Sequence, residues 1–207
     1  MNRLAGFSLE ASQQKKETDC VPSCLKTLFR YQHTKTPEPE FLVGYKKLCH
    51  LAGWRPNTGT PTKLPVDRIN KHLHPIGCEM RSEKAEDLEV IVKLLEEKNP
   101  PMVSFSFRNV EKWYPYRRCR TYGHLNNPSW DHSVIPLRIT GGPHGRVYFF
   151  DPLEPSTPKE IKSNDWKGNS MDKPNFLEAW RQASGFNLSF LHKEKNPSEG
   201  QAKLGGW

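Results

Sequence analysis

The sequence has no long apolar run. No stretch within its 207 residues approaches the roughly 20 consecutive apolar residues that a membrane-spanning helix needs. Residues 1–9 also lack the apolar segment of a secretory signal peptide. We therefore expect a protein without a membrane segment or an export signal.

Cysteine is scarce and irregularly spaced. The five cysteines are odd in number and lack the dense pattern of a disulfide scaffold, which favours free thiols in a reducing, cytoplasmic compartment. A structural zinc site has two closely spaced ligand pairs, whereas only Cys20 and Cys24 are spaced in this way. We predict no metal site and no organic cofactor.

Nucleotide-binding motifs and internal repeats are absent as well. The chain has no Walker loop and no GxGxxG, which argues against nucleotide hydrolysis, and without repeats a solenoid is not expected. Apolar residues make up 35% of the chain, but they gather in short runs, which favours a folded core over disorder. We expect one domain over residues 1–192 and a flexible tail over 193–207.

Positive charge is what the chain has in excess. The formal net charge of +8 favours an anionic partner, although a solvated basic surface is an equally simple explanation. Cations and aromatic residues are interleaved over residues 108–122, which makes Trp113, Tyr116, Arg117 and Arg118 candidate substrate-binding residues. A nucleic-acid contact is the less favoured reading of this segment, and a solvated loop with its aromatics packed on the core is the third.

Apolar periodicity and the positions of Gly and Pro predict helices in the first half of the chain and strands in the second. The expected helices cover residues 19–31, 40–51, 66–73 and 85–98, with a loop over 53–65. The expected strands cover residues 102–107, 132–139, 146–150 and 186–191. Helices followed by an antiparallel sheet are typical of an α+β domain.

Cys20 lies where a reactive thiol would be stabilised. Thr18 or Asp19 can cap a helix that begins at Cys20, and Pro22 is tolerated only in a first turn. The helix dipole and the unpaired backbone N–H groups at such an end favour an anion, here a thiolate. Cys24, four residues later, is expected to be a packing residue.

His132 and Asp151 are expected to be neighbours. His132 opens one predicted strand, and Asp151 follows the next one after a turn over residues 140–145, so a hairpin brings the two side chains together. A carboxylate at this point would fix the imidazole tautomer and leave the second ring nitrogen for a thiol. Asp131 is a rival partner, but neighbouring residues in a strand point to opposite faces.

Each of these residues also has a purely structural interpretation. Cys20 would then be a small buried hydrophobic residue, His132 a structural histidine, and Asp151 part of a turn, since Asp-Pro is a common turn dipeptide. An oxyanion donor has two candidates, Gln13 and Gln14, which precede Cys20 by seven and six positions.

Taken in order, the segment from Gln14 to Cys20, then His132, then Asp151 with its following proline, resembles the bacteriocin-processing, or double-glycine leader, peptidase family of papain-like cysteine proteases. Residues 176–180, with the sequence FLEAW, resemble the segment that follows the aspartate in that family. The sequence departs from the family at Val21, because glycine usually follows the nucleophile.

The resemblance implies a papain-like fold, in which N-terminal helices with the nucleophile at a helix start pack on an antiparallel sheet. It selects Gln14 over Gln13 by the six-residue spacing, and it implies a Cys20, His132 and Asp151 triad that cleaves peptide bonds in a peptide or protein substrate. Two alternatives stay open: an acyl or amide transferase with the same triad, and a basic binding module without catalysis.

Overall fold

The computed structural model describes residues 6–16, 18–61, 64–85, 87–106, 131–142, 144–154, 157–184 and 187–193. The helices are α1 (Cys20–Lys35), η1 (Pro39–Phe41), α2 (Tyr45–Leu51), α3 (Val66–Leu73), η2 (His74–Ile76), α4 (Glu89–Glu96) and α5 (Lys173–Ser184). The strands are β1 (Ser8–Glu10), β2 (Cys78–Lys84), β3 (Met102–Ser106), β4 (Asp131–Ile139), β5 (Arg146–Phe150), β6 (Glu160–Lys162), β7 (Ser170–Asp172) and β8 (Asn187–Lys193).

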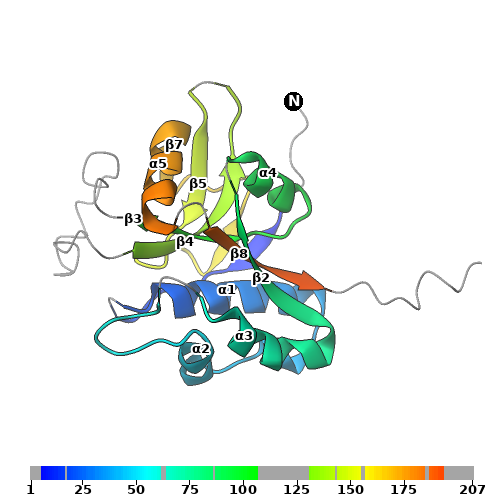
Figure 1. Cartoon of the computed structure of the whole chain (residues 1–207). Coiled ribbons are helices and arrows are strands. Elements are labelled where there is room, and N and C mark those ends of the chain that lie inside the picture. The colour runs from blue at the N-terminus through cyan, green and yellow to red at the C-terminus, as the bar shows by residue number, and fades with distance from the viewer. Residues whose placement is uncertain are drawn as a thin grey trace, which may run out of the picture.

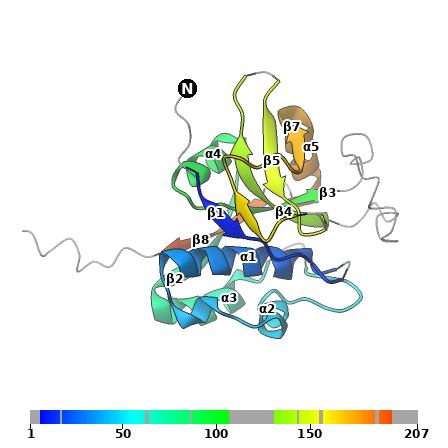
Figure 2. The ribbon, with the colours of Figure 1, turned by 180° about the vertical axis from the view of Figure 1, so that it is seen from behind.

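The strands form an antiparallel sheet in the order β2-β8-β3-β4-β5-β7, together with a small β1-β6 sheet. α1 packs against β4 and β1, α3 against β2, and α5 against β3. Figures 1 and 2 show α1, α2 and α3 together on one side of the molecule, with β5, β7, α4 and α5 on the other. The predicted α+β class, with helices packed on an antiparallel sheet, is confirmed.

The predicted order of elements needs one correction. α4 and α5 lie among the strands in sequence, so the helices do not all precede the sheet. The strand β2 was not expected, because four of its seven residues are exposed and it has no apolar run. An edge strand can have this composition, since only one of its sides is paired within the sheet.

Two predicted helices are shorter than expected. Gly44 adopts an extended backbone, so the expected helix over 40–51 is divided into η1 and α2. α4 begins only at Glu89, whose backbone N–H donates to Asp87 Oδ1 at 2.8 Å, a local bond that competes with helix formation. It ends before Lys98, which has a left-handed φ of 53°.

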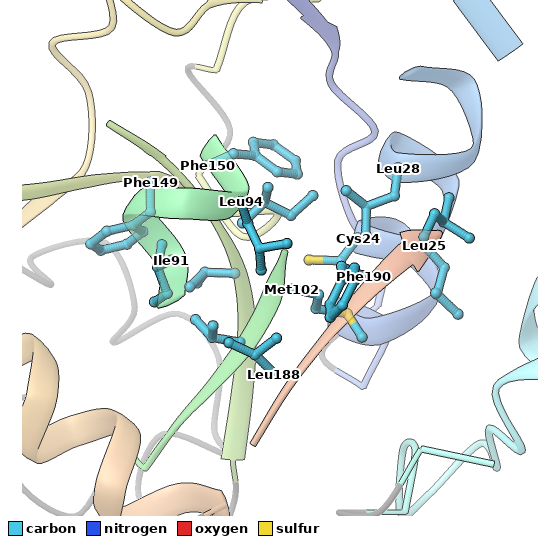
Figure 3. Close-up of a cluster of buried hydrophobic side chains, with 14 of the residues drawn as sticks. Cys24, Leu25, Leu28, Ile91, Leu94, Met102, Phe149, Phe150, Leu188 and Phe190 are labelled. Atoms are coloured by element: carbon cyan, nitrogen blue, oxygen red, sulfur yellow. The ribbon is translucent and has the colours of Figure 1, made fainter. Parts of the chain in front are cut away.

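A continuous hydrophobic core joins the helices to the sheet. Figure 3 shows buried side chains from α1, α4, β3, β5 and β8 gathered in one cluster, among them Leu25, Leu94, Met102, Phe149 and Phe190. The residues of α5 that the family resemblance singled out, Phe176 and Trp180, are fully buried in the same core. This packing fixes α1 against β4, which is what positions the site described below.

Among the described residues, none of the helices combines the length and the apolar character required to cross a bilayer. The C-terminal strand includes Lys193, which pairs with Cys78, so the first residue of the expected tail belongs to the sheet.

Candidate active site

The nucleophile candidate lies where α1 meets the sheet. Cys20 is the first residue of α1, and its side chain is 9% exposed. One turn later, Cys24 is fully buried and its Sγ lies 3.4 Å from the carbonyl oxygen of Ser133 on β4. This contact holds the first turn of α1 across the start of β4 (Figure 1).

His132 and Asp151 form a buried pair. The expected β4–β5 hairpin is confirmed, with Ile135 opposite Phe150 in the register. Extending that register by one step sets Asp151 opposite Val134, two residues from His132 and therefore on the same face of the sheet. His132 Nε2 lies 2.7 Å from Asp151 Oδ1, and both side chains are about 2% exposed.

The alternative partner, Asp131, does not take part in the bond between His132 Nε2 and Asp151 Oδ1. It neighbours His132 in β4, where adjacent side chains alternate between the two faces of the sheet. The strand-pairing argument, which preferred Asp151, is thus confirmed at the level of geometry. That the pair is catalytic remains a prediction.

Asp151 is held in place by its own turn. Its Oδ1 also accepts the backbone N–H of Leu153 at 2.8 Å, and its carbonyl oxygen accepts that of Glu154 at 3.2 Å. The turn interpretation and the charge-partner interpretation of Asp151 therefore hold together, because the Asp-Pro turn is what aims the carboxylate at His132. The sequence signal for the His132–Asp151 bond was the predicted hairpin, and the Asp-Pro dipeptide indicated the turn.

His132 is the neighbour that acts most strongly on the Cys20 thiol. Burial raises the pKa of this thiol, but hydrogen bonding and the charge of His132, with backbone hydrogen bonds at Ser133 and Val21, outweigh burial and lower the pKa overall. Because Nε2 of His132 is engaged by Asp151, we expect Nδ1 to be the ring nitrogen that interacts with the thiol.

The imidazole shows the opposite shift. Burial lowers the pKa of His132, but the charge of Asp151, its hydrogen bond and the neighbouring Cys20 raise the pKa to about 10. A lowered thiol pKa beside a raised imidazole pKa favours a thiolate–imidazolium pair at neutral pH. By contrast, burial and the charges of Cys20 and Asp151 raise the pKa of Cys24 well above its usual range, in keeping with its expected packing role.

The two glutamines before Cys20 have different positions. The Gln13 amide donates to the carbonyl oxygens of Glu154 at 3.2 Å and Thr157 at 3.3 Å, so it fastens the loop after Asp151. The backbone N–H of Gln14 donates to Pro152 O at 2.9 Å, and its side-chain amide donates to Lys16 O at 2.9 Å. An amide NH₂ group has two hydrogens, and the bond to Lys16 uses one of them.

The start of α1 differs from the prediction in one detail. Asp19 occupies the N-cap position but makes no side-chain capping bond, because its Oδ2 accepts the backbone N–H of Lys16 at 3.0 Å. Pro22 in the same turn has no N–H. The positive end of the helix is thus directed at the Cys20 thiol without a competing carboxylate cap.

Sequence reasoning missed Trp54, whose indole N–H donates to the carbonyl oxygen of Thr18 at 2.9 Å. Nothing in its loop indicated that contact. The predicted substrate-binding residues lie outside the described part of the chain: Trp113, Tyr116, Arg117 and Arg118.

Comparison with known proteins places this arrangement in a structural class. No protein-family model matches the sequence, and no curated protein matches it significantly. A protein from Bacillus anthracis described as a C39-like peptidase superposes with a TM-score of 0.53 over 89% of this chain and 95% of its own, at 14% identity. The peptidase domain of Streptococcus ComA, a bifunctional ABC transporter of a quorum-sensing pathway, covers 90% of this chain and 98% of its own, with 17% identity and a TM-score of 0.49.

The fold is therefore that of the C39 papain-like peptidases, as the motif resemblance predicted. At such low sequence identities, the similarity shows the fold of the chain alone.

Proposed function

We propose that this chain is a cysteine peptidase that cleaves peptide bonds with Cys20 as nucleophile, His132 as general acid and base, and Asp151 as the residue that orients His132. Gln14 and the backbone N–H of Cys20 would stabilise the oxyanion. The proposal is carried by one observation: the buried His132 imidazole lies 2.7 Å from the buried Asp151 carboxylate, on the strand that packs against the helix that Cys20 begins. A Cys20 pKa that is lowered by His132 against the effect of burial agrees with this geometry. Shifted pKa values of this kind cluster at functional sites.

The chemistry follows in two half-reactions. The Cys20 thiolate attacks the scissile carbonyl carbon, and the electrons of the C=O bond move to oxygen, where the hydrogen-bond donors stabilise them. When the C–N bond breaks, imidazolium His132 gives its proton to the leaving amine. A water then attacks the thioester while neutral His132 takes its proton, which releases the acid and restores the thiol pair.

The same acyl-enzyme can react with an amine in place of water, which would make the chain an acyl or amide transferase. Both activities need the same three residues, so only the products distinguish them. The chain is incubated with a peptide that it cleaves and an added amine acceptor, and the products are identified by mass analysis. A transferase gives a new amide, and a peptidase gives a free carboxylate.

The test of the proposal is turnover in matched variants. Cys20→Ala and His132→Ala should each abolish cleavage in a substrate-profiling digest of a proteome, because nucleophile and base act as one unit. Cys49→Ala is the control, since Cys49 is a partly buried free thiol of α2 with no place in this mechanism. It should cleave like the wild type.

Thiol labelling tests the same proposal without a substrate. With limiting iodoacetamide near neutral pH, Cys20 should be alkylated before Cys24 and Cys49. The pKa values of Cys24 and Cys49 are raised, and burial is the main cause for both. A Cys20 that labels no faster than Cys49, or a Cys20→Ala variant that still cleaves at the wild-type rate, would refute the assignment. The first result would favour the basic binding module.

A further inference from the structure

A hollow of about 250 Å³ lies between α2 and α3, in the loop that joins them. We call it the arginine pocket. Its walls are the indole of Trp54, three basic side chains and two prolines: His50, Arg55, Arg68, Pro61 and Pro65. In Figures 1 and 2 this connecting segment runs beside the start of α1.

Hydrogen bonding and close packing fix the shape of the arginine pocket. Arg68 Nη1 donates to the carbonyl oxygen of His50 at 2.9 Å, which ties α3 to the end of α2. Gly53 has a left-handed φ of 68°, and a Cβ built there would meet Pro65 at 3.4 Å and Pro61 at 3.6 Å. Because proline fixes its own backbone angle, these walls are arranged before any ligand arrives.

The lining of the arginine pocket is basic. Its lining contains no Asp or Glu, and within the described part of the chain neither Arg55 nor Arg68 takes part in an ion pair. Arg68 bonds to a neutral carbonyl, which leaves the charge of its guanidinium in place. Lys16 adds a further cation, with Nζ 5.8 Å from the centre of the Trp54 ring. A carboxylate is the side chain that complements such a group.

The arginine pocket lies next to Cys20 along the chain. Trp54 Nε1 donates to Thr18 O at 2.9 Å, and Thr18 Oγ1 donates to Pro56 O at 3.4 Å, so the loop wraps around Thr18. Thr18 precedes Cys20 by two residues, a span of at most about 7 Å. A peptide whose scissile bond lies over Cys20 therefore reaches the arginine pocket within two to four of its own residues.

We infer that the arginine pocket is a substrate subsite for an acidic side chain, Asp or Glu, two to four residues from the bond that Cys20 attacks. This inference rests on the proposed peptidase function. The Trp54 ring provides the apolar surface for the stem of the side chain, and Arg55 and Arg68 provide donors for its carboxylate.

Two synthetic decapeptide pools test the subsite, identical except that Glu in one is Gln in the other. Calorimetric binding is measured on Cys20→Ala, and kcat/KM on the otherwise wild-type chain. The Glu pool should bind at least about tenfold more tightly, which is about 1.4 kcal/mol. In R55Q/R68Q this preference should vanish, while the rate of Cys20 alkylation stays at the wild-type value.

The matched control is K47Q/K71Q, which removes the same charge from exposed positions of α2 and α3 that do not line the arginine pocket. It should keep the Glu preference. Equal affinity for the two pools, or an equal loss in the control, would overturn the subsite. So would tight binding of a single-stranded oligonucleotide that is lost in R55Q/R68Q and falls steeply with salt, because it would identify a nucleic-acid surface.

The two proposals can fail separately. If the wild type cleaves neither pool but Cys20→Ala still prefers Glu, the peptidase function is wrong and the acidic-ligand site stands. If both pools are cleaved with equal kcat/KM, the peptidase function stands and the subsite is wrong.

Discussion

Cys20 and Cys24 lie one helical turn apart and have opposite thiol chemistry. Both are buried and free, so burial raises both pKa values. The difference comes from the neighbours: Cys20 faces His132, whereas Cys24 packs against the carbonyl oxygen of Ser133 and meets the charges of Cys20 and Asp151. We therefore expect the neighbours of each thiol, and not burial alone, to decide which of the two is reactive.

Asp151 controls the protonation of His132, which leads to a prediction about pH. Although burial lowers the His132 pKa, the Asp151 charge is the strongest influence that raises it toward about 10. In the proposed mechanism turnover needs imidazolium, so it should be lost as pH rises through that pKa, and it should be lost at acid pH as the Cys20 thiolate takes up a proton. Asp151→Asn should therefore shift the alkaline limb of the rate–pH profile to lower pH and reduce kcat, though less than Cys20→Ala.

The control for this measurement is Asp131→Asn, which changes the neighbouring carboxylate of β4. It should leave the alkaline limb in place. A larger loss of rate in Asp131→Asn than in Asp151→Asn would contradict the pairing seen across the β4–β5 hairpin.

At the scale of elements, the loop before α1 is joined to the loop after β5 by two adjacent glutamines. Gln13 bonds to the carbonyl oxygens of Glu154 and Thr157 through its side chain, and Gln14 bonds to Pro152 O through its backbone. Side-chain truncation therefore removes a loop contact at Gln13 and leaves this backbone bond intact at Gln14. Substitution of Gln13 therefore tests a structural contact, and substitution of Gln14 tests the proposed oxyanion donor.

We predict that Gln14→Ala lowers kcat roughly 100- to 1,000-fold by removing an oxyanion donor. Gln13→Ala should lower the free energy of unfolding by about 1–2 kcal/mol, since it removes two hydrogen bonds, and should leave kcat within a few-fold of the wild type. Steady-state kinetics and urea unfolding of both variants check this. The reverse ranking of kcat would assign the oxyanion role to Gln13.

The sequence was most informative where a local pattern decides the structure. α3 and β5 have the predicted bounds, because a periodic apolar face and Gly or Pro breaks define them. β2 was missed because four of its seven residues are exposed and it has no apolar run, while its pairing with β8, more than 100 residues away, leaves no local signal. The His132–Asp151 geometry was predictable because a hairpin is local, whereas the Thr18–Trp54 contact depends on how α2 packs.

For the molecule as a whole, β8 is the strand that connects β2 to the rest of the sheet. It lies between β2 and β3, so it joins the strand nearest α3 to the strand beside the candidate active site. Its side chains Leu188, Phe190 and Leu191 are buried in the core. Because these pairings are distant in sequence, we expect them to form late in folding.

Truncation of the chain tests this role. A variant that ends at residue 186 loses β8 and three large core side chains, each worth about 2–5 kcal/mol, against a typical total stability of about 5–15 kcal/mol. It should fail to unfold cooperatively in urea and should lose the fast alkylation of Cys20, because β3 and β4 are no longer supported from that side. A variant that ends at Lys193 keeps every residue of β8 and should match the full chain in both measurements. Cooperative unfolding of the shorter variant would show that β2 and α3 are stable without the strand that links them to the rest of the sheet.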